Sequence, residues 1–365
     1  MQPPPPDDDP RAALAEPGVR PAKAATVKEV AAAAGVTGIT VSRVFSGNAK
    51  VAEATRARVL AAAEQLRYRP NRRAQMLRTG RSNLIGLLFA ADAPFVDGIY
   101  ARLIRELSIA ASRRGLDLVL IPTVGGVERW GLKVSDQRVD GCLVVQPMPR
   151  PLVGLLSRYP VPVVFLNLEA DGTRPQVNVD DVAGGRAAAE HLYGLGHRRI
   201  GLVLWPEDKG DRFHYSVRQR EEGVRAAAAA AGRPKPTLYR ARPEGTATLL
   251  ERLEKLTPAR RPTGLIFYTD ETAAAFHASA LDAGVRLPDA YSTIGFNDQS
   301  AEQTWPSLTS VALPLDEMAE LGVERLQRVI GVDAEGNPPG PVGSPEPLAP
   351  RLVVRASTAP PRADG

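Results

Sequence analysis

The residues with the clearest chemical pattern lie in the stretch GVTGITVSRVFSG, residues 35–47. Its middle is typical of a helix, and the face opposite the apolar stripe carries four residues at i, i+4 spacing: Gly38, Ile39, Ser42 and Arg43. A helix, a tight turn at 35–36 and a second helix with a polar N-terminal face form a helix-turn-helix, which presents base-reading residues to the DNA major groove. Gly38 costs roughly 1 kcal/mol in a helix, which a close backbone approach to the groove would explain. Spacing alone leaves a generic helical hairpin as the alternative.

A second set of residues directly follows short apolar strands. Ligands of open parallel sheets lie outside the carboxyl ends of the strands, so these positions predict a ligand site. They are Asp92, Pro94, Phe95, Asn167, Thr269, Asp270, Asn297 and Asp298. Phe95 could stack on a sugar ring, as could Trp205 if its loop folds inward, although such aromatic residues are more often part of the core.

The pattern of catalytic residues needed for an enzyme is missing. The four histidines lack zinc-site spacing, and Cys142, the sole cysteine, lies in the apolar run GCLVVQ, which predicts a buried thiol. The glycines of GLGHRRIGLV precede a strand, whereas a dinucleotide-binding loop follows a strand and opens a helix. We therefore predict no enzymatic activity, no metal and no cofactor. One cysteine excludes an internal disulfide and fits a reducing cytoplasm.

Three short helices are expected to position the first set. Thr26-Val-Lys-Glu29 predicts a capping box, and Gly35 ends that helix. Thr37 can cap the second helix, over 37–46. A third helix is predicted from about 55 to 67, and Pro70 closes the group. Its inward residues are Val59, Ala62, Ala63 and Leu66.

From residue 84 the pattern changes to apolar strands that alternate with helices. The strands are expected at 84–89, 116–121, 141–146, 162–167, 198–205, 263–268, 291–296 and 351–357, and helices include 181–194, 217–231 and 271–283. This alternation favours parallel sheets covered by helices on both faces. Two such sheets fit, with a break near residues 168–185. The acids Asp180 and Asp181 are expected to start a helix.

The charge distribution and the ends of the chain further narrow the possible partners and location of the protein. Residues 23–82 hold twelve Lys and Arg against three Asp and Glu, a local charge of +9 against +5 for the whole chain, which indicates a polyanionic partner for this part. The start, MQPPPPDDDP, does not resemble a signal peptide, and the longest apolar runs are too short to span a membrane. Residues 1–24 and 358–365 are predicted to be disordered.

The stretches TVKEVAAAAGVTGITVSRVFSG, NVDDVAGGRAAAEHLYGLGHRRIGLV, RQREEG, IGFND and LVVRAST together resemble the lac repressor-type (LacI/GalR) family of transcription regulators. The resemblance covers about residues 26–358. It implies an N-terminal all-α helix-turn-helix head at 25–70, a hinge helix at 71–82, and an α/β periplasmic-binding-protein-like body of two parallel-sheet subdomains at 83–357. It also implies a dimer, double-stranded operator DNA as partner and a small-molecule effector.

Carried onto this sequence, the resemblance places Gly38, Ile39 and Arg43 at base-reading positions. Arg43 can donate two hydrogen bonds to guanine, and Ile39 offers apolar contact. Phosphate or groove contacts fall on Thr37, Thr40, Ser42, Thr55 and Tyr68. Ala52 departs from the usual serine, which removes a helix cap and a phosphate contact.

The stretch NRRAQMLRTG, residues 71–80, matches the hinge. It is too short to form a stable helix alone in water. In the family this segment folds in the minor groove, and Leu77 takes the position that wedges a base step open. The other hinge residues expected to contact DNA are Asn71, Arg72 and Ala74. A basic linker with stray apolar residues is the alternative.

On the ligand side, Arg220 matches the family arginine that binds effector hydroxyls or a carboxylate, although a solvated surface charge is the ordinary reading of such a residue. Asn297 replaces a usual aspartate and Thr269 a common asparagine. We expect Asn297 to face Arg220 and to leave it less neutralised, which favours a ligand with an acidic or strongly accepting group, whereas the family favours a neutral sugar.

The sequence therefore predicts a cytoplasmic, dimeric transcription regulator that acts as a repressor and is controlled by a sugar or related metabolite. The alternative is a solute-binding protein of a transport system, which shares the body fold.

Overall fold

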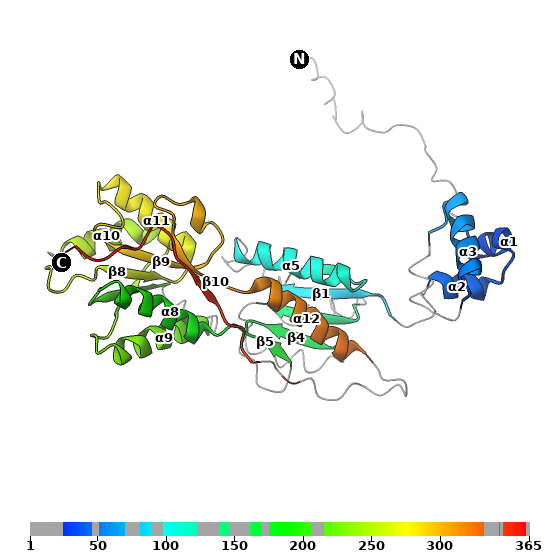
Figure 1. The fold of residues 1–365 in the computed structure, drawn as a ribbon, viewed down its shortest axis with the longest axis horizontal. Coiled ribbons are helices and arrows are strands. Elements are labelled where there is room, and N and C mark those ends of the chain that lie inside the picture. The colour runs from blue at the N-terminus through cyan, green and yellow to red at the C-terminus, as the bar shows by residue number, and fades with distance from the viewer. Residues whose placement is uncertain are drawn as a thin grey trace, which may run out of the picture. The chain divides into compact units, whose positions relative to one another are not determined.

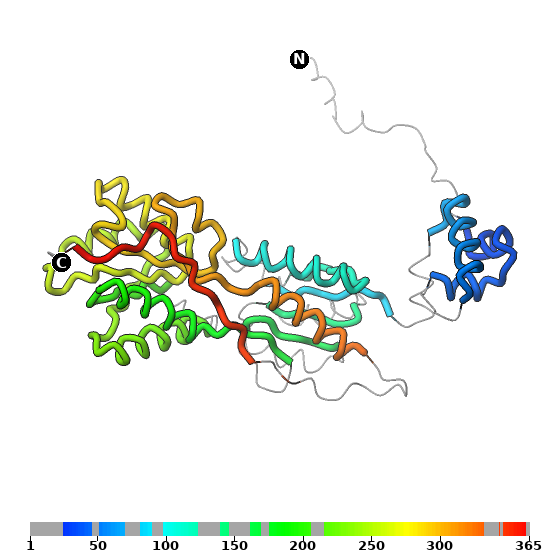
Figure 2. Tube along the Cα trace, in the orientation of Figure 1, coloured from blue at the N-terminus to red at the C-terminus, as the bar shows by residue number. Residues whose placement is uncertain are grey.

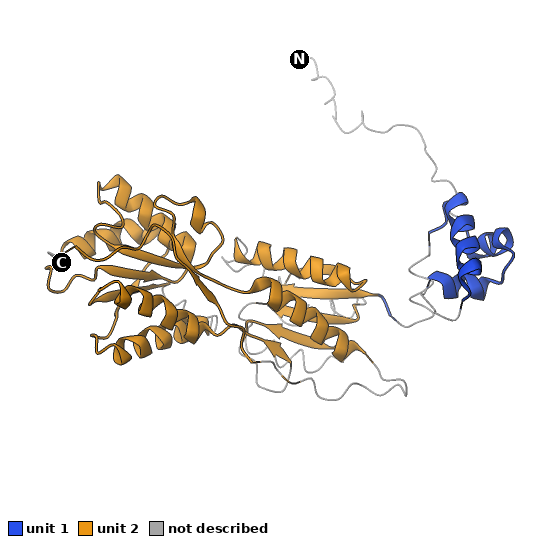
Figure 3. Cartoon of the chain, in the orientation of Figure 1, with its two compact units in different colours: residues 1–82 blue, residues 83–365 orange. Residues whose placement is uncertain are grey.

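The computed structural model describes residues 25–45, 51–69, 81–89, 98–122, 139–145, 161–168, 175–205, 215–331, 343 and 346–362. The chain divides into two compact units, residues 1–82 and residues 83–365 (Figure 3). Among the described residues, no helix has the length and apolar character needed to cross a membrane.

The described residues of the first unit form three helices. They are α1 (Val27–Ala34), α2 (Gly38–Phe45) and α3 (Glu53–Gln65). The predicted capping box is present, since Glu29 N–H donates to Thr26 Oγ1 and the Thr26 N–H donates to the Glu29 carboxylate at 2.6 Å. Gly35 ends α1 in the left-handed region at φ 63°. Ala52 precedes α3 without a side-chain cap.

A small apolar core joins these helices. Its buried residues are Val30, Ala31, Ala34, Val41, Val44, Val59, Ala62 and Ala63. The prediction for Leu66 was wrong, because α3 ends at Gln65 and leaves Leu66 38% exposed. The predicted helix boundaries shift by one or two residues, and the order of helices is as expected.

The second unit contains two sheets (Figure 1). The first has the order β2-β1-β3-β4-β5, with β1 (Leu84–Phe89), β2 (Asp117–Pro122), β3 (Gly141–Val145), β4 (Val163–Leu166) and β5 (Gln176–Val177), all parallel. The helices packed against it are α5 (Ile99–Arg113) and α12 (Leu315–Ile330). Cys142 is fully buried between β1 and β4, as predicted, and burial raises the pKa of its thiol to about 12.

The second sheet has the order β11-β10-β9-β8-β6-β7. Its strands are β6 (Ile200–Leu204), β7 (Thr237–Arg240), β8 (Gly264–Phe267), β9 (Ser292–Asn297), β10 (Thr309–Ala312) and β11 (Arg351–Val353). The accompanying helices are α8 (Asp181–Gly194), α9 (Ser216–Ala230), η2 (Pro243–Gly245), α10 (Thr246–Glu254), α11 (Asp270–Asp282) and η3 (Ala301–Gln303). The expectation of purely parallel sheets was wrong at one edge, because β11 runs antiparallel to β10.

The chain crosses between the two sheets three times, as the trace in Figure 2 shows, whereas the sequence predicted one break at 168–185. The first crossing follows β5 and ends at α8, inside the predicted range. The second follows β10, after which Leu315 and the rest of α12 join the core of the first sheet. The third brings residues 346–350 back to β11, beside a bridge between Val179 and Leu348.

The C-terminal segment packs on the second sheet through residue 362. Thr358 hydrogen-bonds the ring of His191, and the Ala359 carbonyl lies 3.0 Å from His197 Nε2. Arg362 pairs with Asp289 at 2.5 Å. The expectation of disorder from residue 358 was therefore wrong for 358–362, because the proline- and arginine-rich composition hid these specific partners. Residues 363–365 lie outside the described residues.

Candidate DNA interface and ligand site

The outward face of α2 carries the predicted base-reading residues. Ile39 is 67% exposed and Arg43 is exposed, while Val41 and Val44 on the opposite face are buried. A Cβ added at Gly38 would lie 3.4 Å from the nearest heavy atom, a Val27 methyl, which is ordinary contact. Packing within the head therefore does not require glycine there. This face therefore offers an apolar side chain, Ile39, and a charged hydrogen-bond donor, Arg43.

The residues predicted to contact phosphate differ in how they are held within the head. Thr37 Oγ1 accepts from the Thr40 N–H at 3.3 Å and lies 3.0 Å from the Thr40 hydroxyl, so the pair also caps α2. Ser42 and Thr55 are half-buried. The Tyr68 ring packs edge-on against Phe45 with centroids 5.5 Å apart, which ties it to the core of the head.

The carboxyl edge of the second sheet collects the predicted residues Thr269, Asp270 and Asn297. Thr269 caps α11, since its hydroxyl accepts from the Thr272 N–H at 3.3 Å. Both Asp270 oxygens accept hydrogen bonds, one from the Ser310 hydroxyl at 2.6 Å and one from the Gln299 N–H at 3.0 Å. Asn297 is 5% exposed and takes a left-handed φ of 99°. The side chains of Thr269 and Asp270 thus hold this edge of the second sheet together.

Asp270 is buried, and this burial raises the pKa of its carboxyl to about 7. The hydrogen bonds from Ser310 and Gln299 act in the opposite direction, while the carboxylates of Glu271 and Asp298 add to the rise. Asp298 itself pairs with Arg355 at 2.6 Å, so its carboxylate holds the loop after β9.

Arg220 is 4% exposed on α9 and is not a solvated surface charge. Its Nε donates to Asp181 Oδ1 at 2.7 Å, and one terminal nitrogen donates to the Tyr268 carbonyl at 2.6 Å. The guanidinium carbon lies 4.1 Å from the centroid of Phe296 and 4.7 Å from that of Tyr268, in cation–π contact with both rings. The expectation that Asn297 leaves Arg220 less neutralised was wrong, because Asp181 pairs with the guanidinium and neutralises its charge.

Asp181 is the functional candidate that sequence reasoning missed. It was predicted only as an acid at a helix start, which α8 confirms, with Asp180 as the N-cap. Asp181 is fully buried, and its second oxygen, Oδ2, has no hydrogen-bond partner among the described residues. A buried unpaired carboxylate oxygen costs free energy unless a ligand donates to it. Two acids in succession were the available signal, but the sequence did not identify Arg220 as the partner.

Two glycines explain how this pair forms. A Cβ on Gly185 of α8 would lie 2.3 Å from the Arg220 carbonyl, and one on Gly223 of α9 would lie 2.0 Å from the Val182 carbonyl. The helices therefore touch backbone to backbone. This close approach brings Arg220 on one helix within reach of Asp181 on the other.

The carboxyl edges of the two sheets face each other within the second unit. The Tyr215 hydroxyl, at the start of α9, donates to Asn167 Oδ1 after β4 at 2.7 Å. Next to α5, Gly98 lies so close to Gln299 and Glu271 that a Cβ would be 2.4 Å from the Gln299 oxygen. Asn167, which the sequence predicted as a ligand residue, thus joins the two subdomains. The predicted residues Asp92, Pro94, Phe95, Asn71, Arg72, Ala74 and Leu77 lie outside the described residues.

The histidines of the described ranges serve the fold. His197 lies 2.8 Å from the Thr263 hydroxyl, and His277 lies 2.7 Å from that of Thr293. Burial lowers the pKa of His277 to about 4, so it is neutral near pH 7. Over the same ranges, no group of three or more His, Cys, Asp or Glu is arranged to hold a metal ion.

A helix-turn-helix head joined to a body of two facing α/β subdomains, with a buried polar pair at the facing edges, defines a DNA-binding transcription regulator. Residues 26–71 match the model of the bacterial regulatory proteins of the lacI family, and residues 189–358 match a periplasmic binding protein-like domain. The chain belongs to the lacI family of bacterial regulatory proteins.

Individual relatives agree with this assignment. The ribose operon repressor of Escherichia coli (strain K12) is 32% identical over 314 residues, which cover 83% of this chain and 92% of that protein. A transcriptional regulator CelR–cellobiose complex is 28% identical with a TM-score of 0.63, over 92% of this chain and all of the other. The lac repressor dimer bound to operator and an anti-inducer shares the fold, with 24% identity and a TM-score of 0.72 over the same coverage.

Proposed function

We propose that this regulator binds a pseudo-palindromic operator as a dimer and acts as a repressor whose DNA affinity is controlled by a neutral, polyhydroxylated ligand such as a sugar. One observation carries the ligand proposal: the buried Arg220–Asp181 pair with its unpaired Asp181 Oδ2 at the edge of the second sheet. A protein with both features can bind a ligand at the pair and DNA at the exposed face of α2. The names of the ribose and cellobiose relatives support the same ligand class.

The charge of the pair selects the ligand. Because Asp181 already neutralises Arg220, an acidic ligand would bring an uncompensated negative charge into a buried site, which is costly. A hydroxyl group can donate to Asp181 Oδ2 and accept from the remaining guanidinium N–H groups. Adjacent hydroxyls on a sugar ring supply both functions. This reverses the preference for an acidic ligand that Asn297 alone suggested.

The DNA contacts proposed are those of α2 and its surroundings. Ile39 and Arg43 read base edges, Gly38 allows close approach, and the phosphate contacts are supplied by Thr37, Thr40, Ser42, Thr55 and Tyr68. Asn71, Arg72, Ala74 and Leu77 complete the interface as hinge residues. Two heads related by a two-fold axis would read two half-sites, which is the reason for a palindromic operator. We infer that the protein acts in the cytoplasm, where its DNA is, and has no catalytic role.

Two measurements on the full chain test this function. In vitro selection from random duplexes is expected to enrich an inverted repeat, and enrichment of no sequence would contradict it. A thermal-shift panel that pairs neutral sugars with their acid forms is expected to show stabilisation by a neutral member only. At a hundred times its dissociation constant such a ligand adds about 2.7 kcal/mol to stability. Stabilisation by the acids alone would refute the ligand class.

A further inference from the structure

A hollow of about 400 Å³ lies in the second sheet's subdomain, away from the Arg220–Asp181 pair. It is formed where β6 and β7 begin and where α10 ends. The residues that line it are Arg199, Ile200, Pro234, Lys235, Thr237, Tyr239, Arg252, Leu256 and Arg260. Because β7 is the edge strand of its sheet, its outer side pairs with no further strand of this sheet.

The rim of this hollow is strongly basic. Arg199, Lys235, Arg252 and Arg260 are all exposed, and no carboxylate is among the described residues that line it. Glu254, in the last turn of α10, is engaged elsewhere: it accepts from the Tyr291 hydroxyl at 2.5 Å and lies 3.5 Å from Arg261. Four exposed cations around one concavity create a local positive potential, which attracts an anion to it.

The floor of the hollow is mixed. Tyr239 is 5% exposed, with the Arg252 guanidinium 6.0 Å from its ring centroid, and Leu256 is half-buried. The Thr237 hydroxyl adds a donor at the start of β7. A hollow of this size accommodates a ligand as large as a nucleotide. Arginine guanidinium groups donate to phosphate oxygens in pairs, which suits them to a ligand with several phosphate groups.

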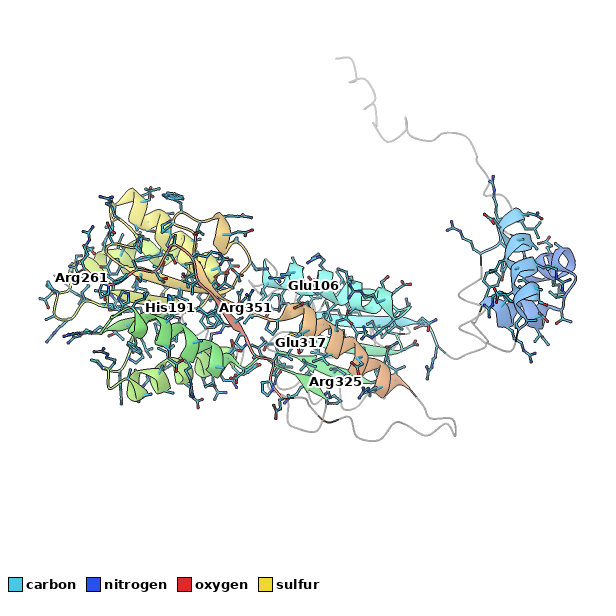
Figure 4. All side chains as sticks on the ribbon, in the orientation of Figure 1. Glu106, His191, Arg261, Glu317, Arg325 and Arg351 are labelled. Carbon is cyan, nitrogen blue, oxygen red and sulfur yellow. The ribbon has the colours of Figure 1, made fainter. Side chains whose placement is uncertain are left out.

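The topology separates this hollow from the site at the facing edges. Arg199 and Thr237 stand at the amino-terminal ends of their parallel strands, whereas Thr269 and Asn297 stand at the carboxyl ends of β8 and β9. A five-residue strand spans roughly 16 Å, so the two sites lie at opposite edges of one sheet. Arg261, next to Arg260 in the chain, is labelled at the end of this subdomain farthest from α5 and α12 in Figure 4.

We propose that this hollow binds a small polyphosphate anion, either inorganic or as part of a nucleotide, at a site separate from the sugar site. The four cations hold the phosphate groups, and Tyr239 and Leu256 contact any organic part. The proposal does not rest on the function proposed above, because it concerns other residues at the opposite edge of the sheet.

Calorimetric titration of the full-length protein with pyrophosphate and with ATP tests this site, at constant ionic strength and without DNA or sugar. The test variant is Lys235→Gln/Arg260→Gln, two exposed residues at the rim. The control is Arg225→Gln/Arg286→Gln, which removes the same charge elsewhere on this subdomain. We expect saturable binding to wild type and control, and at least tenfold weaker binding to the test variant. Inorganic tripolyphosphate, titrated in parallel, has as many phosphate groups as ATP. Tighter binding of ATP than of tripolyphosphate would assign contacts to the floor, and equal affinity would assign recognition to the phosphates alone.

Three results would overturn the site. One is the absence of saturable binding to wild type at millimolar concentrations of these anions. Another is equal weakening in the test and control variants, which would indicate general electrostatic attraction. The last is unchanged binding by the test variant, which would place the anions elsewhere, for example on the basic head. Thermal melting of each variant verifies folding, and Arg260→Gln alone replaces the double variant if that one melts early. Sugar binding at the Arg220–Asp181 pair is measured separately and is expected to be unchanged.

Discussion

At the scale of single residues, the buried polar groups of the second subdomain have distinct tasks. Asp181 and Arg220 form a neutral pair in which Asp181 Oδ2 has no hydrogen-bond partner among the described residues. Asp270, although it follows a strand in the same manner, uses both oxygens to bind Ser310 and Gln299. A position after a strand therefore predicted that Asp270 lies at the carboxyl edge of the sheet. The hydrogen bonds of the two acids distinguish Asp181, the ligand candidate, from Asp270, which has a structural task.

Asp270 is expected to make stability depend on pH. Its pKa rises from 3.8 in the unfolded chain to about 7 in the folded protein, so the folded state holds the extra proton between these values. This contribution is fully present below about pH 4 and is lost as the pH rises through 7. Asp270→Asn mimics the protonated acid, so its melting temperature should gain on wild type from pH 5 to pH 8. Titration of the histidines affects both proteins equally and drops out of the difference between them. A difference in melting temperature that stays constant with pH would contradict the prediction.

Arg43 is expected to contribute sequence specificity. Arg43→Ala should weaken operator binding by about 1–3 kcal/mol and relax one base position in each half-site, while binding to random duplex falls less. Lys28→Ala is the matched control, because an exposed lysine on α1 contacts at most phosphate and should weaken all DNA equally. Fluorescence anisotropy on both duplexes measures this. Equal losses for Arg43→Ala on the two duplexes would exclude base reading.

At the scale of elements, the strands with continuous apolar runs were predictable, and the short polar ones were not. The sequences of β7, TLYR, and β10, TSVA, lack such a run, and their place in the sheet comes from neighbours distant in the chain. The crossing of α8 over α9 was also unpredictable, because it depends on two glycines at one contact. Of the candidate site, Arg220 was predictable through a family resemblance, whereas its partner Asp181 was not.

The contact between α8 and α9 makes a testable demand on Gly223. Gly223→Ala would place a methyl group 2.0 Å from the Val182 carbonyl, which forces the helices apart and costs about 1–3 kcal/mol. We expect a lower melting temperature and loss of sugar binding, since Arg220 moves away from Asp181. Gly194→Ala is the control, because a Cβ there has no atom within 4 Å. That variant should melt at or above wild type, and equal destabilisation of both would refute the contact.

The start of α3 offers a gain of stability. Ala52 supplies no side-chain oxygen to the first turn, so Ala52→Ser should add a cap of about 1 kcal/mol to the helix. Hydrogen exchange of α3 amides in the full chain should slow. Ala61→Ser, at an exposed mid-helix position, should not slow it. Exchange that is unchanged by Ala52→Ser would mean that the first turn is already capped.

At the scale of the whole molecule, local patterns predicted two sheets and the first crossing but not the return. The helix α12 follows the strands of the second sheet in sequence and packs on the first, and β11 then rejoins the second. The amphipathic pattern of α12 indicates a buried face but does not indicate which sheet covers it. Three crossings join the subdomains into one unit. We infer that a ligand at their facing edges alters their mutual arrangement and so reaches the DNA-binding head.

We propose that a ligand bound at Arg220 and Asp181 controls the affinity of the protein for its operator. The most direct test measures operator affinity of wild type and Arg220→Ala, each with and without the sugar found by thermal shift. Coupling of this kind amounts to about 1–3 kcal/mol. We therefore expect the sugar to change wild-type affinity at least fivefold, and Arg220→Ala to bind operator as wild type does but without response. An equal response in both proteins would contradict the account.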